Sequence, residues 1–209
     1  MSTEMNIYNK KYELTDTTKT IGYGITLHRI RALRDFRYVK KGDLGGWIEK
    51  EENLSHDGDA WVGEEACVFG NAKVSGNAYV YENAQVYGDA RVYGNAIVYN
   101  HSRVHGCAKV FDSATVYNYA LVSGYARVYG AAQVFGNAHV YEYARVFDRA
   151  KLYSSALVHG HAHVYGTTVV FGCAMVYGNA HVYGRTSLSG DAIVHGGALV
   201  CDAVSEDDD

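Results

Sequence analysis

Residues 60 to 200 repeat one six-residue pattern 24 times without an insertion. The stretch from 83 to 100, NAQVYGDARVYGNAIVYN, contains three of these repeats in a row. The first position of the hexapeptide is Ala 21 times, and the third position is Val 22 times and Leu twice. A fixed period of this kind is typical of a solenoid, in which each unit buries its apolar side against its neighbours.

The hexapeptide fits a strand better than a helix. An amphipathic helix needs apolar residues about every 3.6 positions, whereas residues two positions apart point to the same side of a strand. We therefore expect a four-residue strand with Ala and Val inward, followed by a two-residue Gly-Asn or Gly-Asp corner. Such short strands, repeated by translation, predict parallel stacking in a triangular prism with three hexapeptides, or 18 residues, in each turn.

Composition agrees with this all-β interpretation. The chain has no proline, as expected where nearly every backbone N–H donates to a neighbouring strand.

No secretory signal or membrane-spanning stretch is evident, so a cytoplasmic protein without a membrane partner is predicted. Four acidic residues at the last four positions equal the whole net charge of -4, which argues against a nucleic-acid polymer as partner. The four cysteines lack the CxxC spacing of a zinc site.

The VYGNA motif and its variants, over roughly residues 54 to 201, resemble the hexapeptide-repeat superfamily, whose members form left-handed parallel β-helices. The left hand is implied by this resemblance. The preceding segment, which contains the motif LGGWI, looks like the cap of a branch found in bacteria and their phages. We expect a β-hairpin and loop cap at 1–53, a β-helix of about eight turns at 54–203 and a disordered acidic tail at 204–209.

The winding predicts three outer faces, each built from residues 18 positions apart. One face carries apolar and aromatic side chains and a single charge, Lys151, which is typical of a buried contact. We expect a homo-oligomer here, with a trimer favoured; the alternative is a solvated face stabilised by its aromatic ladders. The predicted interface residues are Trp61, Tyr79, Ile97, Tyr99, Tyr117, Phe135, Val169 and Phe171. A second face is mixed and indicates nothing specific.

The third face presents a column of cationic side chains beside a column of aromatic ones. Like charges on neighbouring strands repel, and an anionic ligand would offset that repulsion. In YARVY and YARVF a guanidinium is expected between two rings, which suits a flat anionic ligand such as a nucleotide. The predicted ligand-binding residues are Arg91, Lys109, Arg127, Arg145, His163, Tyr125, Tyr129, Tyr143 and Phe147. The alternative is a solvated column relieved by cation–π contacts and by Asp89, Asp112 and Asp148.

The segment HGHAH places His159, His161 and His163 close together in the sequence. In the predicted register these side chains straddle a corner of the prism, and no carboxylate or Cys accompanies them. Because a metal ion needs ligands that converge on one point, no metal site is predicted, and no cofactor is expected.

Three classes of function remain open. We favour a non-catalytic oligomeric binding protein that sequesters an anionic small ligand, such as a nucleotide signal, in the bacterial host if the chain is phage-encoded. The superfamily resemblance implies acyl transfer as an alternative, with His163 or His181 as general base. Those enzymes commonly interrupt their coils with a pocket-forming loop, which the repeats between 60 and 200 lack. A purely structural assembly protein is the third possibility.

Overall fold

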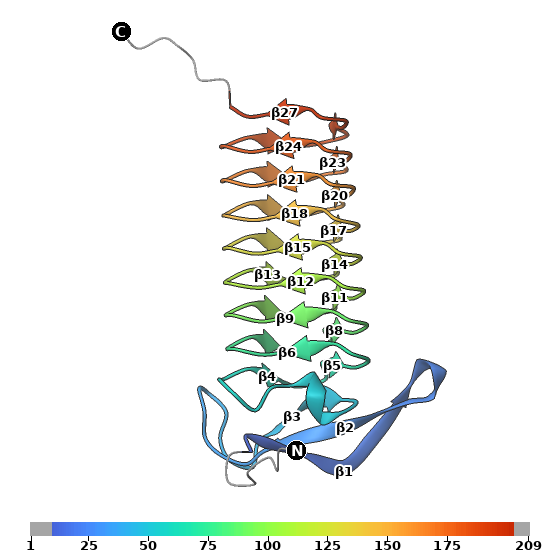
Figure 1. Ribbon diagram of the computed structural model, residues 1–209, viewed down its shortest axis with the longest axis vertical. Helices are drawn as coiled ribbons and strands as arrows, with labels where there is room; N and C mark the ends of the chain where they lie inside the picture. Colours follow the sequence, from blue (N-terminus) through green and yellow to red (C-terminus); the bar gives the residue numbers. More distant parts are fainter. Residues whose placement is uncertain (1–9, 203–209) are drawn as a thin grey trace, which may run out of the picture.

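The computed structural model describes residues 10–202, and it is a parallel β-solenoid (Figure 1). These residues form 27 strands, no α-helix and two single-turn 3-10 helices, η2 (Gly22–Gly24) and η3 (Glu51–Asn53). No helix in this part of the chain is long and apolar enough to span a membrane. The all-β solenoid predicted from the hexapeptide period is confirmed. The predicted acidic tail at 204–209 lies outside the described residues.

Three parallel sheets form the sides of the solenoid. One side contains β5 (Cys67–Val68), β8 (Gln85–Val86), β11 (Arg103–Val104), β14 (Leu121–Val122), β17 (His139–Val140), β20 (Leu157–Val158), β23 (Met175–Val176) and β26 (Ile193–Val194). The next contains β6 (Lys73–Val74), β9 (Arg91–Val92), β12 (Lys109–Val110), β15 (Arg127–Val128), β18 (Arg145–Val146), β21 (His163–Val164), β24 (His181–Val182) and β27 (Leu199–Val200). The last contains β4 (Trp61–Val62), β7 (Tyr79–Val80), β10 (Ile97–Val98), β13 (Thr115–Val116), β16 (Gln133–Val134), β19 (Lys151–Leu152), β22 (Val169–Val170) and β25 (Ser187–Leu188). We call them the β5–β26, β6–β27 and β4–β25 faces.

Adjacent turns pair in parallel with a shift of 18 residues, so that Tyr79 is the partner of Ile97 and Arg127 that of Arg145. The backbone N–H of each outward residue donates to a carbonyl of the following turn, as Arg127 does to Ala144 at 2.9 Å. The predicted winding is confirmed. Side chains at equivalent positions therefore form straight columns along the solenoid.

The strands are two residues long, where the sequence predicted four. The residue after the inward Val still donates to the next turn, as in Tyr93 N to Val110 O at 3.0 Å. The following residue then takes a positive φ, 71° at Gly94 and 57° at both Asp112 and Asp148, and turns the chain into the next face. Gly, Asn and Asp tolerate this conformation better than other residues, which explains the corner composition.

The inward columns form a continuous apolar core. Every first-position and third-position side chain from Ala60 to Val182 is fully buried. Burying one Val side chain contributes about 1.5 kcal/mol or more to folding. The polar members Ser102 and Thr168 donate their hydroxyl protons to backbone carbonyls three residues earlier, both at 2.7 Å. The interior is filled, so any ligand must bind on an outer face or at an end.

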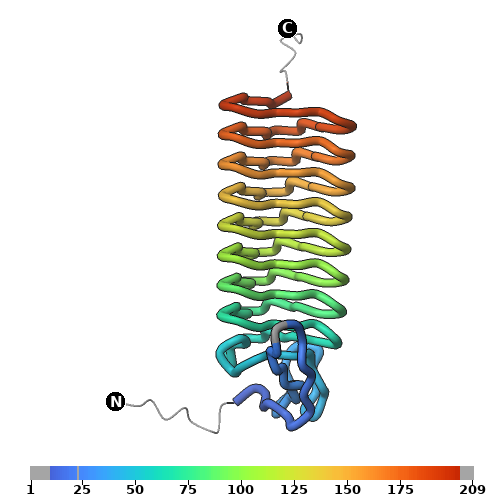
Figure 2. Tube along the Cα trace, turned by 90° about the vertical axis from the view of Figure 1, so that its right-hand side faces the viewer, coloured from blue at the N-terminus to red at the C-terminus, as the bar shows by residue number. Residues whose placement is uncertain are grey.

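The N-terminal segment covers one end of this core (Figure 2). Strands β1 (Tyr12–Ile21) and β2 (Ile25–Ala32) form an antiparallel hairpin, and β3 (Leu44–Ile48) pairs antiparallel with β2 and parallel with β5. The LGGWI segment therefore begins the first turn of the solenoid, within the range 1–53 that the sequence assigned to the cap. Leu54 and β4 complete that turn, which brings the total to about nine.

Candidate functional site

Cationic side chains follow five neighbouring strands of the β6–β27 face. They are register partners from strand to strand, and His163 and His181 continue the same line on β21 and β24. The winding thus brings together side chains that are 18 residues apart in the sequence. We call the five the cation column: Lys73, Arg91, Lys109, Arg127 and Arg145.

No member of the cation column forms an ion pair with another described residue. The three nearby Asp carboxylates, which the sequence suggested as partners, are engaged elsewhere. Asp112 accepts a hydrogen bond from the backbone N–H of Gly130 at 3.2 Å, and Asp148 accepts one from Gly166 at 3.1 Å. Asp89 accepts one from the Asn71 side chain. These carboxylates therefore tie successive corners together, and none of them forms an ion pair with the column.

Two ladders of stacked rings border the cation column. The Tyr93 ladder has centroid spacings of 4.8–5.2 Å. The Tyr125 ladder, on the preceding corners, has spacings of 4.9–5.0 Å. The first ladder consists of Tyr93, Phe111, Tyr129, Phe147, Tyr165 and Tyr183, and the second of Tyr125, Tyr143 and His161.

The rings contact one another rather than the arginines. The cation–π contacts of the described chain involve Lys11, Lys19, Arg29, Arg34 and Arg37, all N-terminal to the repeats. The guanidinium groups of Arg127 and Arg145 in YARVY and YARVF thus lie between the two ladders but form no cation–π contact with a described ring. Stacking covers both faces of each ring inside a ladder, so a flat ligand can stack only where a ladder ends.

The cation column lies along a groove made of adjoining hollows. One hollow of about 560 Å³ is lined by Asp89, Arg91, Cys107, Lys109, Tyr125, Arg127, Tyr143, Arg145, His161 and His163. A larger hollow of about 900 Å³ lies between the column and the cap and shares Arg91 and Lys109 with the first. The structure thus gathers Arg91, Lys109, Arg127, Arg145 and His163 of the predicted set into one hollow, together with Tyr125 and Tyr143. Tyr129 and Phe147 belong to the adjacent ladder.

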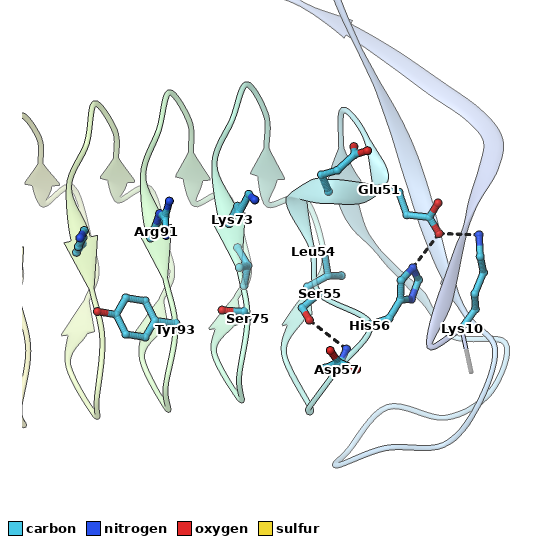
Figure 3. Close-up of a pocket in the computed structure, with 13 residues that line it drawn as sticks. Lys10, Glu51, Leu54, Ser55, His56, Asp57, Lys73, Ser75, Arg91 and Tyr93 are labelled. Atoms are coloured by element: carbon cyan, nitrogen blue, oxygen red, sulfur yellow. Dashed lines mark hydrogen bonds and ion pairs between the residues drawn. The ribbon is translucent and has the colours of Figure 1, made fainter. Parts of the chain in front are cut away.

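The larger hollow contains residues that the sequence analysis missed. Glu51 Oε1 accepts hydrogen bonds from Lys10 Nζ at 2.7 Å and is 2.8 Å from His56 Nε2 (Figure 3). Burial alone would raise the pKa of Glu51, but its bonds to Lys10 and His56 outweigh burial and lower it. The charged segment KEENLSHD at 50–57 was the available signal, but its position could not be derived because it lies before the first hexapeptide.

Of the two histidines considered as general bases, His163 lines the far end of the groove and His181 lies one turn beyond it. The rings of His163 and His181 are 4.6 Å apart and inclined by 58°. Burial lowers the pKa of His163, and His181, Arg145 and His161 lower it further. A neutral imidazole can accept a proton from an acceptor hydroxyl or amine, so His163 has the protonation state that a general base requires at neutral pH.

The histidines of HGHAH do not converge. His159 stacks on Tyr141 at 4.7 Å, whereas His161 stacks on Tyr143 at 4.9 Å in the Tyr125 ladder. His163 points outward from β21. Within residues 10–202, no group of three or more His, Cys, Asp or Glu residues could hold a metal ion.

The predicted interface face carries another continuous ladder, with centroid spacings of 4.7–5.0 Å. This Tyr81 ladder consists of Tyr81, Tyr99, Tyr117, Phe135, Tyr153 and Phe171. Trp61 differs from the prediction, because it is 4% exposed beneath the cap and its ring meets that of Phe36 at 5.3 Å. It cannot line an interface on the outer surface. Its burial reflects the cap fold, which the repeat does not specify.

Comparison with known proteins supports the solenoid assignment. A family model described as the YdcK beta solenoid repeat matches residues 84–100 and 90–106. The chain resembles a YdcK-type solenoid in this segment. It is also 32% identical over 74 residues to a protein of Escherichia coli (strain K12) named "Uncharacterized acetyltransferase YdcK". That stretch covers 32% of this chain and 23% of the YdcK protein, so the chain spans about a quarter of its relative's length. These matches support a relationship to hexapeptide-repeat-like β-helix proteins.

Proposed function

We propose that the protein is a non-catalytic binding protein that holds an anionic small ligand on its β6–β27 face. The observation that carries the proposal is the cation column, in which five positive side chains on adjacent strands have no ion-pair partner among the described residues. Like charges in cross-strand positions destabilise a sheet. A bound anion converts that repulsion into attraction.

The chemistry of the groove favours a ligand with several negative charges. Arg presents a fork of N–H donors that matches phosphate and carboxylate oxygens, and three of the five column members are Arg. The column members lie one strand spacing apart, about 4.8 Å, so one phosphate chain can contact several of them. A nucleotide signal in the cytoplasm of a bacterial host, with the protein encoded by a phage, is the biological setting we propose.

Calorimetric titration with tripolyphosphate tests the proposal. Wild-type protein should bind it, and Arg127→Glu and Arg145→Glu should each weaken binding at least about ten-fold, because losing one charge-assisted hydrogen bond is worth about 1.5–3 kcal/mol. Arg103→Glu is the matched control, since Arg103 is an equally outward strand residue on the β5–β26 face. The absence of binding, or equal losses in all three variants, would overturn the proposal.

We further propose that the protein is a homo-oligomer, with a trimer favoured, whose contacts are made by the β4–β25 face. Its outward side chains include Ile97 and Val169, and the Tyr81 ladder runs beside them. Lys151 is its one charged outward strand residue. A second copy of the same face is the occupant that matches this apolar surface, because Lys151 is the one strand charge that such a contact would have to accommodate.

Acetyl transfer is the second candidate, and two observations favour it. The E. coli relative is named an acetyltransferase, and the lowered pKa of His163 suits a general base at the end of a cationic groove. The absence of an inserted loop between 60 and 200 weighs against it. Incubation with acetyl-CoA and a panel of amines should release no thiol if the protein only binds its ligand. Thiol release that His163→Asn abolishes would establish acetyl transfer.

Filaments in electron micrographs would instead favour a structural assembly role.

A further inference from the structure

The Tyr93 ladder stops two turns short of the cap. The next equivalent positions toward the N-terminus are Ser75 and Ser55, whose backbone N–H groups donate to Val92 and Val74 at 3.0 and 2.9 Å. Both residues therefore occupy the same column as Tyr93 but carry no ring. Figure 3 shows Tyr93, Ser75 and Ser55 in one line, beside a parallel line that contains Lys73 and Arg91.

The missing rings leave one face of Tyr93 uncovered. Its other face stacks on Phe111 at 4.9 Å with the planes 1° apart. Inside the ladder every ring is covered on both sides, so Tyr93 presents a ring-sized space above Ser75 where the next ladder member would lie. This space is part of the hollow of about 900 Å³ that Lys73, Arg91 and Lys109 also line.

The cap forms one wall of the hollow, to which Glu52 and Asp57 also contribute, without adding an unpaired negative charge at Glu51. That carboxylate is bonded to Lys10 and lies against His56, at 2.7 and 2.8 Å. The Ser55 hydroxyl accepts a hydrogen bond from Asp57 N at 3.0 Å, whereas the Ser75 hydroxyl has no hydrogen-bond partner among the described residues. A ligand in the gap would thus meet a free hydroxyl, an open aromatic face and three cations, with the carboxylates of Glu52 and Asp57 on the cap side of the same hollow.

We propose that the ligand carries a planar aromatic ring, which stacks on Tyr93 in the gap above Ser75, with its phosphate groups on the cation column. The chemical class is a nucleotide rather than a plain polyanion, because the gap accepts a flat ring and the neighbouring column accepts phosphates. This inference rests on the proposed anion-binding function of the same face. It moves the centre of the site toward the cap, away from the Tyr125 to Phe147 region predicted from the sequence.

A second gap provides a comparison within the same molecule. On the β5–β26 face, Ser123 interrupts the ladder between His105 and Tyr141, which stack on Tyr87 and His159 on their other sides. The outward residues beside that gap are Arg103, Leu121 and His139, a single Arg rather than a run of Lys and Arg. The Ser123 gap has no column of cations beside it and is not expected to bind a nucleotide. Filling it with a ring therefore controls for the effect of completing a ladder as such.

The experiment compares ATP with tripolyphosphate by calorimetry, since the two carry similar phosphate charge and differ in the ring. Wild-type protein should bind ATP at least ten-fold more tightly than tripolyphosphate. Ser75→Phe fills the gap and should reduce ATP affinity to that of tripolyphosphate, with tripolyphosphate binding unchanged. Tyr93→Ala should do the same, and Ser123→Phe should leave both affinities unchanged.

Retained binding of tripolyphosphate shows that the Ser75→Phe protein is folded and that its column is intact. Equal affinity of wild-type protein for the two ligands, or an ATP preference that survives Ser75→Phe, would overturn this inference and leave the proposed function standing. Failure of both ligands to bind wild-type protein would overturn the two proposals together.

Discussion

Arg127 and Arg145 face each other as register partners on β15 and β18, and neither has an ion-pair partner among the described residues. Two guanidinium groups on adjacent strands of an outer face repel each other, and the fold tolerates this repulsion because the buried Ala and Val columns supply its stability. The face is therefore less stable than it could be. Binding sites commonly carry such a deficit.

Neutralising one of these charges should stabilise the protein. Arg127→Gln keeps a long polar side chain but removes repulsion from both Lys109 and Arg145, and we expect a gain of about 0.2–1 kcal/mol in the free energy of unfolding at low salt. The gain should shrink at high salt because screening weakens the repulsion in wild-type protein. Urea denaturation at two salt concentrations measures both effects. A loss of stability at low salt would show that the column is not repulsive.

The corner carboxylates should act through hydrogen bonds and not through their charge. Asp148 has a φ of 57° and accepts a hydrogen bond from Gly166 N. Asp148→Asn keeps an acceptor and tolerates this φ, so its free energy of unfolding should stay within about 0.5 kcal/mol of wild type. Asp148→Ala should lose about 1–2 kcal/mol. If Asp148 instead stabilised the protein by offsetting the charge of Arg145, Asp148→Asn would lower the free energy of unfolding as much as Asp148→Ala. Urea denaturation of the two variants measures this difference.

Acidification should destabilise the protein in part through His163. Its folded-state pKa lies below the ordinary 6.5, chiefly because of burial, so the unfolded chain takes up a proton before the folded chain does. Stability should therefore fall as the pH drops through about 6.5 and stop changing from this source below the folded-state pKa. His163→Gln should show a smaller difference in urea midpoint between pH 7.5 and pH 5. An identical pH dependence in the variant would contradict this expectation.

The proposed oligomer should depend on the β4–β25 face alone. Phe135→Glu puts a charge into the middle of the Tyr81 ladder, where burial against a second copy would leave it unpaired. We expect light scattering to report an oligomer for wild type and a monomer for this variant. Tyr141→Glu, a ladder residue of the β5–β26 face, is the control and should stay oligomeric. A monomeric wild type would end the oligomer proposal.

The repeat region could be predicted from the sequence because its period determines its neighbours. With no insertion between 60 and 200, the winding places Arg127 next to Arg145 and Tyr125 next to Tyr143, as the structure shows. The rings stack on one another rather than on the guanidinium groups for a physical reason. Residues two apart along a strand are separated by about 6.6 Å, whereas neighbouring strands are about 4.8 Å apart. Each ring therefore stacks on the ring of the next turn.

The cap region could not be predicted in the same way, because it has no repeat to propagate. Trp61 occupies an outward hexapeptide position, yet Phe36 and the hairpin bury it. His56 stacks on Tyr12 at 4.3 Å, a contact between residues far apart in the sequence. The missing ring at Ser75 follows from the repeat, but the hollow beside it depends on these cap contacts and became visible only in the structure.

The most direct test of the central claim, that a column built by 18-residue winding binds the ligand, compares two deletions. Removing residues 114–131 takes out one full turn and Arg127, but leaves Lys109 next to Arg145. Removing residues 114–119 takes out one hexapeptide without any charge, but shifts Arg127 and Arg145 onto a different face. Both proteins keep the inward Ala and Val pattern.

Titration of these two proteins with tripolyphosphate separates column geometry from net charge. We predict that the 114–131 deletion, despite having lost a cation, keeps an affinity close to that of wild type. The 114–119 deletion, with its net charge unchanged, should lose most of its affinity. Equal affinities, or tighter binding by the 114–119 deletion, would contradict the account.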